Sequence, residues 1–124
     1  MNQTNSANNL KFGDIIKLDF SPTEGHEQRG YRPALVLTNP QEQNHKLNGM
    51  VSVVPITKTK KAFPTHVALD NSTKTQGSIL IEHHRMVDLH TRGFKYVEEL
   101  SEEKLKQVKI IIVALYEELL SIET

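Results

Sequence analysis

The sequence contains no cysteine, and its 15 basic and 15 acidic residues cancel to a formal net charge of zero. Without cysteine the chain can form no disulfide, offers no thiolate to a metal ion and has no thiol nucleophile. This composition fits a reducing compartment, so the cytoplasm is the expected location. Because the net charge is zero, a nucleic acid, a membrane or an acidic ligand would have to be bound by a local patch of charge.

Long hydrophobic runs are also absent from the sequence. The longest run, Ile110–Leu115, is far shorter than the roughly 20 residues that cross a bilayer, so we expect no membrane partner. The first residues, MNQTNSANN, lack the basic start and apolar middle of a signal peptide, and residues 1–10 are expected to form a flexible polar leader. The remaining length fits a single domain over residues 11–124.

Most of the chain is predicted to form short strands. The segment Asp14–Phe20 alternates between apolar and polar residues, which is typical of a half-buried strand. Pro33–Thr38 and Met50–Thr57 are rich in β-branched residues and predict central strands, with Pro55 at an edge or a bulge. Further strands are expected at Thr65–Leu69, Ser78–Glu82, Arg85–Leu89 and Lys95–Val97. Short strands separated by turns favour an antiparallel barrel or sandwich over about residues 11–98, in a mainly β protein with some α-helix.

The hydrophobic period changes near the C-terminus, where it predicts a helix over about residues 101–122. Ser101 is the expected N-cap, and Glu102 and Glu103 then interact favourably with the helix dipole. The apolar face consists of Leu105, Val108, Ile112, Leu115, Leu119 and Ile122. Further hydrocarbon outside this face comes from Ile110, Ile111, Val113 and Tyr116. This surplus is compatible with a helix set deep in the core and with a contact to a second subunit.

The segment between the first two predicted strands carries polar groups suited to acid–base chemistry. Gly25 and Gly30 flank the sequence HEQR, and glycine allows another backbone to approach closely. His26 could exchange protons near neutral pH, Glu27 could act as a base, and Gln28 could donate and accept hydrogen bonds. A charged loop that is simply solvated explains the same residues, and both interpretations stay open.

Arg32 and Thr57 are the two residues best placed to bind a phosphate. Pro33 biases Arg32 toward an extended backbone, so its guanidinium is held at the start of a strand as bidentate phosphate recognition requires. The alternative is a structural arginine that pairs with a carboxylate across the sheet. Thr57 ends a strand, where its hydroxyl could bond a phosphate or ribose oxygen, although threonine is also a common strand residue. The lysines that follow, Lys58, Lys60 and Lys61, form a local basic patch that indicates nucleic-acid binding.

The sequence EHHR, Glu82–Arg85, does not predict a metal site. Adjacent side chains on a strand point to opposite faces, so His83 and His84 should not bind one ion together, and the chain has no HExxH spacing. We therefore expect neither a metal nor another cofactor. The same alternation would put Glu82 and His84 on one face, which would keep Glu82 available as an acid or base.

Three segments in this order, GDIIKLDFSPTEGHEQRGYRPALVLT, VPIT and RMVDLHTRG, followed by a helix, resemble the MazF/PemK/Kid family of toxins from bacterial toxin–antitoxin pairs. The resemblance covers nearly the whole chain from Phe12 onward. It implies an SH3-like antiparallel β-barrel with a long C-terminal helix, and a homodimer. It also implies a ribosome-independent and metal-independent endoribonuclease, or mRNA interferase, that cuts single-stranded mRNA at short sequences. In this family the ribose 2′-hydroxyl attacks the adjacent phosphate and leaves a 2′,3′-cyclic phosphate, and the acidic tail of a cognate antitoxin inhibits the enzyme.

The resemblance also assigns roles to individual residues. The essential arginine and threonine of the family match Arg32 and Thr57, and the His-Glu pair of one branch matches His26 and Glu27. That branch has an arginine and an aspartate on a later strand, where this chain has Leu80 and Glu82, so a scheme built on that arginine does not transfer. The base therefore stays open between Glu27, His26 and Glu82. Contacts with RNA are expected from Gln28, Arg29, Lys58, Lys60, Lys61, Glu82 and Arg85.

Base recognition is expected from the loop after Thr57 and the loop Pro40–Gly49, because single-stranded RNA exposes its base edges. The fold alone does not define the activity, since gyrase-poisoning toxins share the barrel and act on a protein without being enzymes. A non-enzymatic binding toxin is therefore the alternative function. An inactive family member kept as an interaction module is a third interpretation, against which the intact motif residues count.

Overall fold

The computed structural model of the protein describes residues 6–20, 30–41, 48–60 and 62–121. The strands are β1 (Asp14–Asp19), β2 (Tyr31–Val36), β3 (Met50–Thr57), β4 (His66–Ala68), β5 (Ser78–Leu80), β6 (Arg85–Asp88) and β7 (Lys95–Glu99). The α-helices are α2 (Leu89–Arg92), α3 (Glu102–Leu115) and α4 (Glu117–Leu120), and two short 3-10 turns are η2 (Ala7–Asn9) and η3 (Ile81–His83). All seven strands that the sequence predicted are present, with small differences at their ends.

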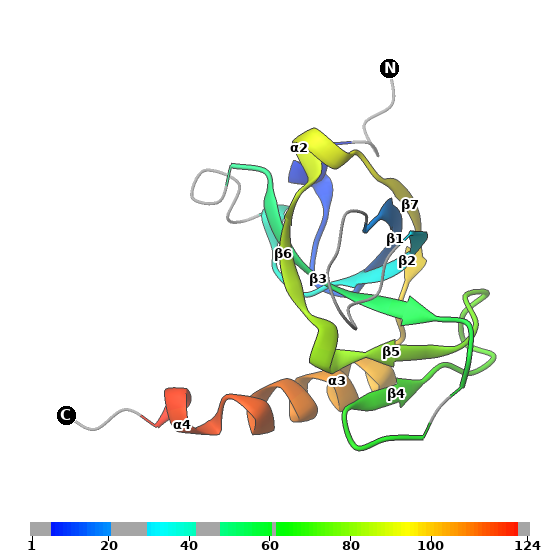
Figure 1. Cartoon of the computed structure of the whole chain (residues 1–124), viewed down its shortest axis with the longest axis vertical. Helices are drawn as coiled ribbons and strands as arrows, with labels where there is room; N and C mark the ends of the chain where they lie inside the picture. The colour runs from blue at the N-terminus through cyan, green and yellow to red at the C-terminus, as the bar shows by residue number, and fades with distance from the viewer. Residues whose placement is uncertain (1–5, 21–29, 42–47, 61, 122–124) are drawn as a thin grey trace.

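The seven strands form one antiparallel sheet in the order β4-β5-β3-β2-β1-β7, with β6 pairing to β3 beside β5. Figure 1 shows these strands curling around one another above α3. The mixed α+β class with an antiparallel sheet is therefore confirmed. Within the described residues the pairing ends at β4 on one side and β7 on the other, so it forms an open, curled sheet and does not complete a closed barrel.

Both faces of the central strands are buried, each in its own cluster. On β1, Ile16 and Leu18 pack in a cluster enclosed by the curled sheet, while Ile15 packs on the opposite face. On β2, Ala34 belongs to the first cluster and Leu35 to the second. The second cluster lies between the sheet and α3, so the strand alternation predicted from the sequence serves two layers of core.

Pro55 sits within β3, at a point where the strand changes neighbours. β3 pairs with β6 over Met50–Val53 and with β5 over Ile56–Thr57, while β2 stays on its other side. Proline cannot donate to a β-ladder, so this gap between two partners is a position where it is tolerated. The prediction of an edge or a bulge at Pro55 was therefore wrong, because β3 is a central strand and Pro55 pairs with Ala34 in regular register.

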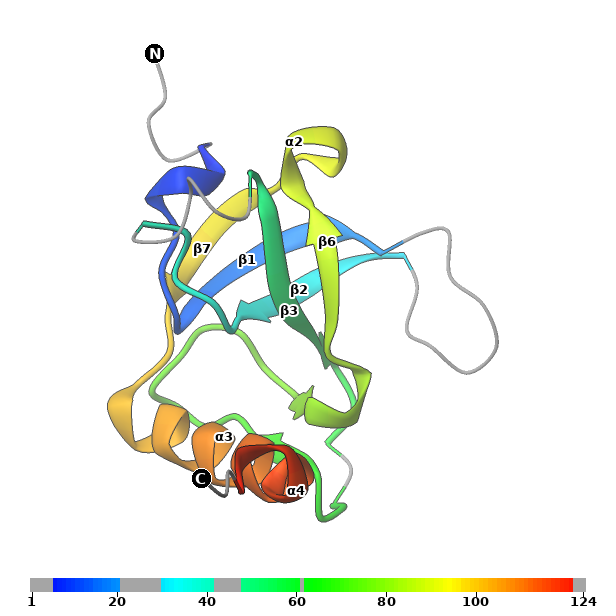
Figure 2. The same ribbon diagram turned by 90° about the vertical axis from the view of Figure 1, so that its left-hand side faces the viewer.

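The C-terminal helix begins where the sequence predicted but is interrupted. The Ser101 hydroxyl oxygen accepts a hydrogen bond from the Lys104 N–H at 3.3 Å and caps α3. The helix ends at Leu115, Tyr116 has non-helical backbone angles, and α4 follows as one further turn. α3 lies along the end of the sheet near β4 and β5, and α4 continues away from it (Figures 1 and 2). In the described residues, no helix is long and apolar enough to cross a membrane.

Candidate RNA-binding hollow

A hollow of about 870 Å³ opens where the end of β3 meets the start of β2 and the turn between β4 and β5. The residues that line it are Lys17, Tyr31, Arg32, Pro33, Ile56, Thr57, Lys58, Lys74, Thr75, Gln76 and Val97. The set includes Arg32, Thr57 and Lys58, which the sequence singled out. The structure thus brings together the two residues best placed to bind a phosphate and the first lysine of the basic patch.

The strand register explains why Arg32 and Thr57 meet. β2 and β3 pair with Ala34 opposite Pro55. Arg32 lies two residues before Ala34, and Thr57 lies two residues after Pro55, so both residues stand just beyond the last pair of this ladder. Arg32 is half-buried, and Pro33 follows it directly as the sequence analysis required. The guanidinium and the hydroxyl therefore reach one end of the same pair of strands.

The hollow is strongly cationic in a chain without net charge. Of the described residues that line it, Arg32 and three lysines carry positive charge, and none is acidic. Lys17, Lys58 and Lys74 are exposed, and within the described chain none of them forms an ion pair with a carboxylate. Like charges gathered in a concave site repel one another, and an anionic ligand relieves that repulsion.

One wall of the hollow is the turn between β4 and β5, and Glu98 of β7 holds it in place. The Glu98 carboxylate accepts hydrogen bonds from the Lys74 N–H at 3.1 Å, the Thr75 N–H at 2.9 Å and the Thr75 hydroxyl at 2.6 Å. Burial alone would raise the pKa of Glu98, but these hydrogen bonds outweigh it and lower the pKa below its usual value of 4.5. The carboxylate therefore stays ionised and the main chain of the turn is fixed.

Gly77 allows this turn to return to the sheet close to Thr57. It has a φ of +117°, and a Cβ atom built on it would lie 1.7 Å from the carbonyl oxygen of Thr57. Only glycine fits such an approach and this backbone conformation. The position of Thr57 in the hollow is therefore coupled to a glycine in the neighbouring strand connection.

Glu82 lies elsewhere, and the expectation for its backbone was wrong. The predicted strand ends at Leu80, which is buried, and Glu82 falls in the 3-10 turn η3, so alternation does not pair it with His84. Its carboxylate bonds the Thr65 hydroxyl at 2.6 Å and His66 Nε2 at 2.8 Å. Burial would raise the pKa of Glu82, but these hydrogen bonds lower it overall. Glu82 does not line the hollow, and its role as a base stays a prediction.

The other polar residues of this region have separate surroundings. His84 bonds the Ile81 carbonyl through Nδ1 at 2.8 Å and the Tyr116 hydroxyl through Nε2. The Arg85 guanidinium lies 5.9 Å from the centre of the Phe20 ring, and its buried Nη1 has no hydrogen-bond partner in the part of the chain described. Lys60 lines a second hollow of about 440 Å³ next to Phe63. In the described residues, no group of three or more potential ligands could hold a metal ion.

Some predicted site residues lie outside the described part of the chain. These are His26, Glu27, Gln28, Arg29 and Lys61. Residues 42–47 of the loop expected to read bases lie outside it as well. Their roles stay predictions from the sequence.

The hollow also contains residues that the sequence analysis did not single out. Lys17, Tyr31 and Lys74 line it together with Thr75 and Gln76. Lys17 looked like an ordinary solvent-facing residue of an alternating strand, and Lys74 like part of a polar turn. No pattern in the sequence separates them from other exposed lysines, because their meeting depends on how β1, β7 and the β4–β5 turn pack.

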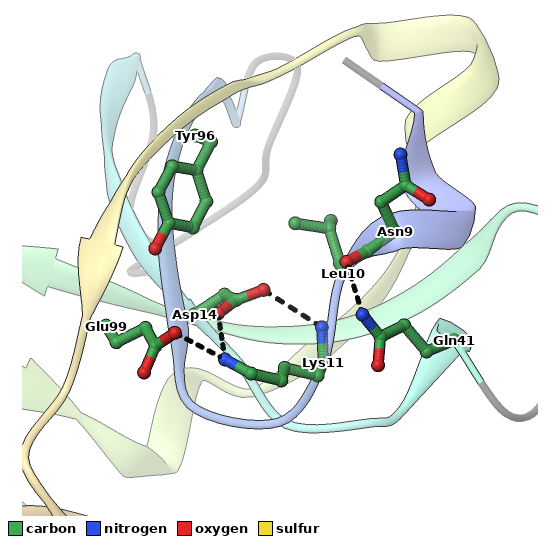
Figure 3. Close-up of a pocket in the computed structure, with 7 residues that line it drawn as sticks. All are labelled: Asn9, Leu10, Lys11, Asp14, Gln41, Tyr96 and Glu99. Carbon is green, nitrogen blue, oxygen red and sulfur yellow. Dashed lines mark hydrogen bonds and ion pairs between the residues drawn. The ribbon is translucent and has the colours of Figure 1, made fainter. Parts of the chain in front are cut away.

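A smaller hollow of about 260 Å³ lies beside the N-terminal segment and is structural in character (Figure 3). Lys11 Nζ lies 3.0 Å from Asp14 Oδ1 and 2.9 Å from Glu99 Oε2. The hydrogen bond to Glu99 is the main cause of the raised pKa of Lys11. Gln41 Nε2 donates to the Asn9 carbonyl at 3.1 Å. These contacts tie the segment before β1 to β7, and they leave its charged groups paired.

The fold and the hollow define a small mixed α+β protein with a cationic site at the ends of its strands. Residues 11–116 match the family model described as PemK-like, MazF-like toxin of type II toxin-antitoxin system, and the chain belongs to this family. Among curated relatives, the endoribonuclease toxin MazF of Escherichia coli K12 is 36% identical over 97 residues, covering 78% of this chain and 85% of that protein. The endoribonuclease toxin ChpB of the same strain is 34% identical over 112 residues, covering 81% and 91%.

Solved structures show the same relationship. The crystal structure of MazF from Deinococcus radiodurans has 30% identity and a TM-score of 0.79, covering 87% of this chain and 96% of that one. A MazE–MazF crystal structure from the same organism has 30% identity and a TM-score of 0.73 over the same shares of the two chains.

Proposed function

We propose that this protein is the endoribonuclease toxin of a toxin–antitoxin pair, and that it cuts single-stranded mRNA in the hollow without a metal ion. The observation that carries the proposal is the meeting of Arg32 and Thr57 in a hollow whose described lining residues include four cationic side chains and no acidic one. The names of the relatives support it, because MazF and ChpB of Escherichia coli are both described as endoribonuclease toxins.

The proposed reaction is an internal transfer of the RNA phosphate. A base removes the proton of the ribose 2′-hydroxyl, the 2′-oxygen bonds to the adjacent phosphorus, and the bond from phosphorus to the 5′-oxygen breaks. The 5′-oxygen takes up a proton, so the products are a 2′,3′-cyclic phosphate and a 5′-hydroxyl. Negative charge grows on the phosphorane oxygens along this path. A fixed guanidinium stabilises that charge without reorganisation, which is the role of Arg32.

Thr57 positions the reacting linkage, with its hydroxyl donating to a phosphate oxygen or to the 2′-oxygen. The base is one of Glu27, His26 and Glu82. The hydrogen bonds of Glu82 to Thr65 and His66 keep its carboxylate ionised but occupy both of its oxygens, which favours one of the other two residues. Lys58 contributes to backbone binding at the edge of the hollow next to Thr57.

The partners follow from the same site and from the helix. An antitoxin with an acidic segment can occupy the cationic hollow and exclude RNA, and a similar solved structure is the MazE–MazF structure from Deinococcus radiodurans. The exposed apolar residues of α3 and α4 supply a surface for a second copy of the chain, so we propose a homodimer.

The test is to incubate the purified protein with a long single-stranded RNA and to sequence both ends of each fragment. Cleavage should leave 5′ ends that a kinase can phosphorylate directly, and 3′ ends that resist ligation until the cyclic phosphate is opened and the resulting phosphate is removed. Fragments with 5′-phosphates would contradict the proposed chemistry. Intact RNA, together with growth arrest on expression, would favour the alternative of a non-enzymatic toxin that acts on a protein target such as gyrase.

A further inference from the structure

Two further lysines that line the hollow lie on elements that are distant in sequence. Lys17 lies on β1, opposite Pro33 of β2 and Lys95 of β7. Lys74 lies in the turn between β4 and β5. Both side chains are exposed, both line the hollow, and no ion pair in the described chain neutralises either of them.

A β-bulge brings Glu98 under the turn that carries Lys74. On β7, Lys95 pairs with Lys17 and Tyr96 with Ile16, but Glu98 pairs with Ile15, so Val97 is an extra residue. Without the bulge Glu98 would stand opposite Asp14 and on the other face, because a shift of one residue reverses every side chain. With it, Glu98 shares the face of Ile15, which is the face packed against β4 residues.

In this arrangement the turn is held through its main chain, and the side chain of Lys74 does not take part in the hydrogen bonds to Glu98. Glu98 accepts from the N–H groups of Lys74 and Thr75 and from the Thr75 hydroxyl. Val97, the bulged residue, lines the hollow itself. Bulges next to functional sites commonly re-aim side chains in this way. The Glu98 carboxylate binds main-chain donors, and the charge of Lys74 adds a smaller attraction that also lowers the pKa of Glu98. Glu98 thus fixes a cation beside the hollow, and in the described residues it forms no ion pair with it.

We infer that Lys17 and Lys74 form a second phosphate subsite, which binds a backbone phosphodiester flanking the scissile one, and that Glu98 is the positioning residue of this subsite. The inference rests on the proposed function in taking the ligand to be single-stranded RNA. The subsite requires no contact with the reacting atoms. It therefore contributes to binding, and the chemical step depends on Arg32 and Thr57.

The first experiment measures the salt dependence of binding to a short fluorescein-labelled oligouridine, which requires no knowledge of the cut sequence. For single strands each phosphate contact contributes about 0.7 to the slope of log K against log salt. Lys17→Gln and Lys74→Gln should each lower the slope by about that amount. Lys106→Gln is the matched control, because Lys106 is an exposed lysine of α3 that does not line the hollow. Slopes equal to that of the unchanged protein in both hollow variants would overturn the inference.

The second experiment locates the phosphate. The RNA carries the cut sequence mapped for the unchanged protein, a 2′-deoxy sugar at the cut position to block cleavage, and a neutral methylphosphonate at one flanking linkage at a time. One flanking position should weaken binding several-fold in the unchanged protein and have no further effect in the Lys17→Gln/Lys74→Gln double variant. If every position weakens binding of the double variant as much as it weakens the unchanged protein, the two lysines contact no particular phosphate.

Glu98 is tested by separating kcat from KM. Glu98→Gln should raise KM several-fold and leave kcat nearly unchanged, because it misplaces the turn and leaves Arg32 and Thr57 intact. The double variant Glu98→Gln/Lys74→Gln should raise KM by less than the product of the two separate increases. Independent effects, or an equal fall of kcat, would show that Glu98 serves only the fold. Thermal unfolding checks that each variant is folded.

The two proposals fail in different ways. If the unchanged protein cuts no RNA but binds oligouridine with a slope that depends on Lys17 and Lys74, the proposed activity is wrong and the subsite stands. If it cuts RNA and neither lysine affects KM or the slope, the activity stands and the subsite is wrong.

Discussion

At the scale of single residues, Arg32 is the side chain on which the proposed chemistry depends most. Replacing it with alanine should lower kcat about 100- to 1,000-fold, as expected for the loss of one preorganised donor to a developing oxyanion. Arg32→Lys should recover only part of the activity, because lysine keeps the charge and loses the bidentate fork. Cleavage of a labelled single-stranded RNA measures both.

The control experiment for Arg32→Ala is a measurement of the stability of the variant. If Arg32 acts on the RNA and does not hold the fold, circular dichroism and thermal unfolding of the alanine variant should stay close to those of the unchanged protein. Retained cleavage by a folded Arg32→Ala protein would remove this residue from the mechanism. If the variant unfolds, Arg32→Lys still distinguishes a catalytic arginine from a structural one.

Glu98 gives a prediction of pH dependence. Its folded pKa lies below the ordinary 4.5, so it stabilises the fold fully above about pH 4.5, and the stabilisation is lost as the pH falls through the lower folded pKa. Glu98→Gln should therefore lower the free energy of unfolding by about 1 kcal/mol at neutral pH, the difference between hydrogen bonds to a charged and to a neutral acceptor. The difference should shrink below pH 4.5 in urea titrations. A difference that is constant with pH would show that the charge of Glu98 is not involved.

How far the sequence predicts the site depends on whether the geometry is local. Arg32 and Thr57 could be found because each is fixed by its own strand, one by Pro33 and the other by a strand end. Lys74 and Glu98 could not be found in this way. Their placement depends on the bulge at Val97, which is a property of the pairing between β1 and β7 and leaves no pattern in either strand.

At the scale of elements, the strands were predictable and the end of the helix was not. Period-two alternation and β-branched runs identified all seven strands. The helical period continues through Tyr116 without a glycine or proline, so the sequence gives no stop there. In the structure the Tyr116 hydroxyl bonds His84 Nε2 in the segment before β6, and the helix breaks at this tertiary contact.

The interrupted helix leaves a large apolar surface. Val108 is fully buried, but Ile110 is 62% exposed and Leu119 73% exposed, with Val113, Leu115 and Leu120 also exposed. Part of the helix thus covers the core and the rest does not, which favours the subunit contact over the deep-set helix. Exposed apolar patches of this kind mark interfaces.

We predict that charged substitutions on this apolar surface dissociate the homodimer. Ile110→Glu combined with Val113→Glu should convert a homodimer into a monomer at micromolar concentration, measured by light scattering coupled to gel filtration, because charge buried in an apolar interface costs several kcal/mol. Gln107→Glu, on an exposed position one turn earlier, should leave the mass unchanged. A monomeric mass for the unchanged protein would refute the dimer.

At the scale of the whole molecule, the proposed mechanism uses only groups of the chain itself. Excess EDTA should therefore leave the cleavage rate unchanged within error, because the cationic side chains take the role that a metal ion has in other nucleases. The rate should fall steeply with added monovalent salt, since RNA binding depends on phosphate contacts. Loss of activity in EDTA that is restored by a divalent cation would contradict the mechanism.

The close approach of Gly77 to the Thr57 carbonyl has a genetic consequence. A cell that carries a growth-arresting protein gains by any change that disarms it, and at residue 77 every side chain must displace the backbone of Thr57. Colonies that survive induced expression from a mutagenised library should therefore carry Gly77 substitutions more often than substitutions of Gly93, where no atom lies within 4 Å of an added Cβ. A cell would then inactivate the protein without changing any charged residue, because a single added methyl group at Gly77 is enough.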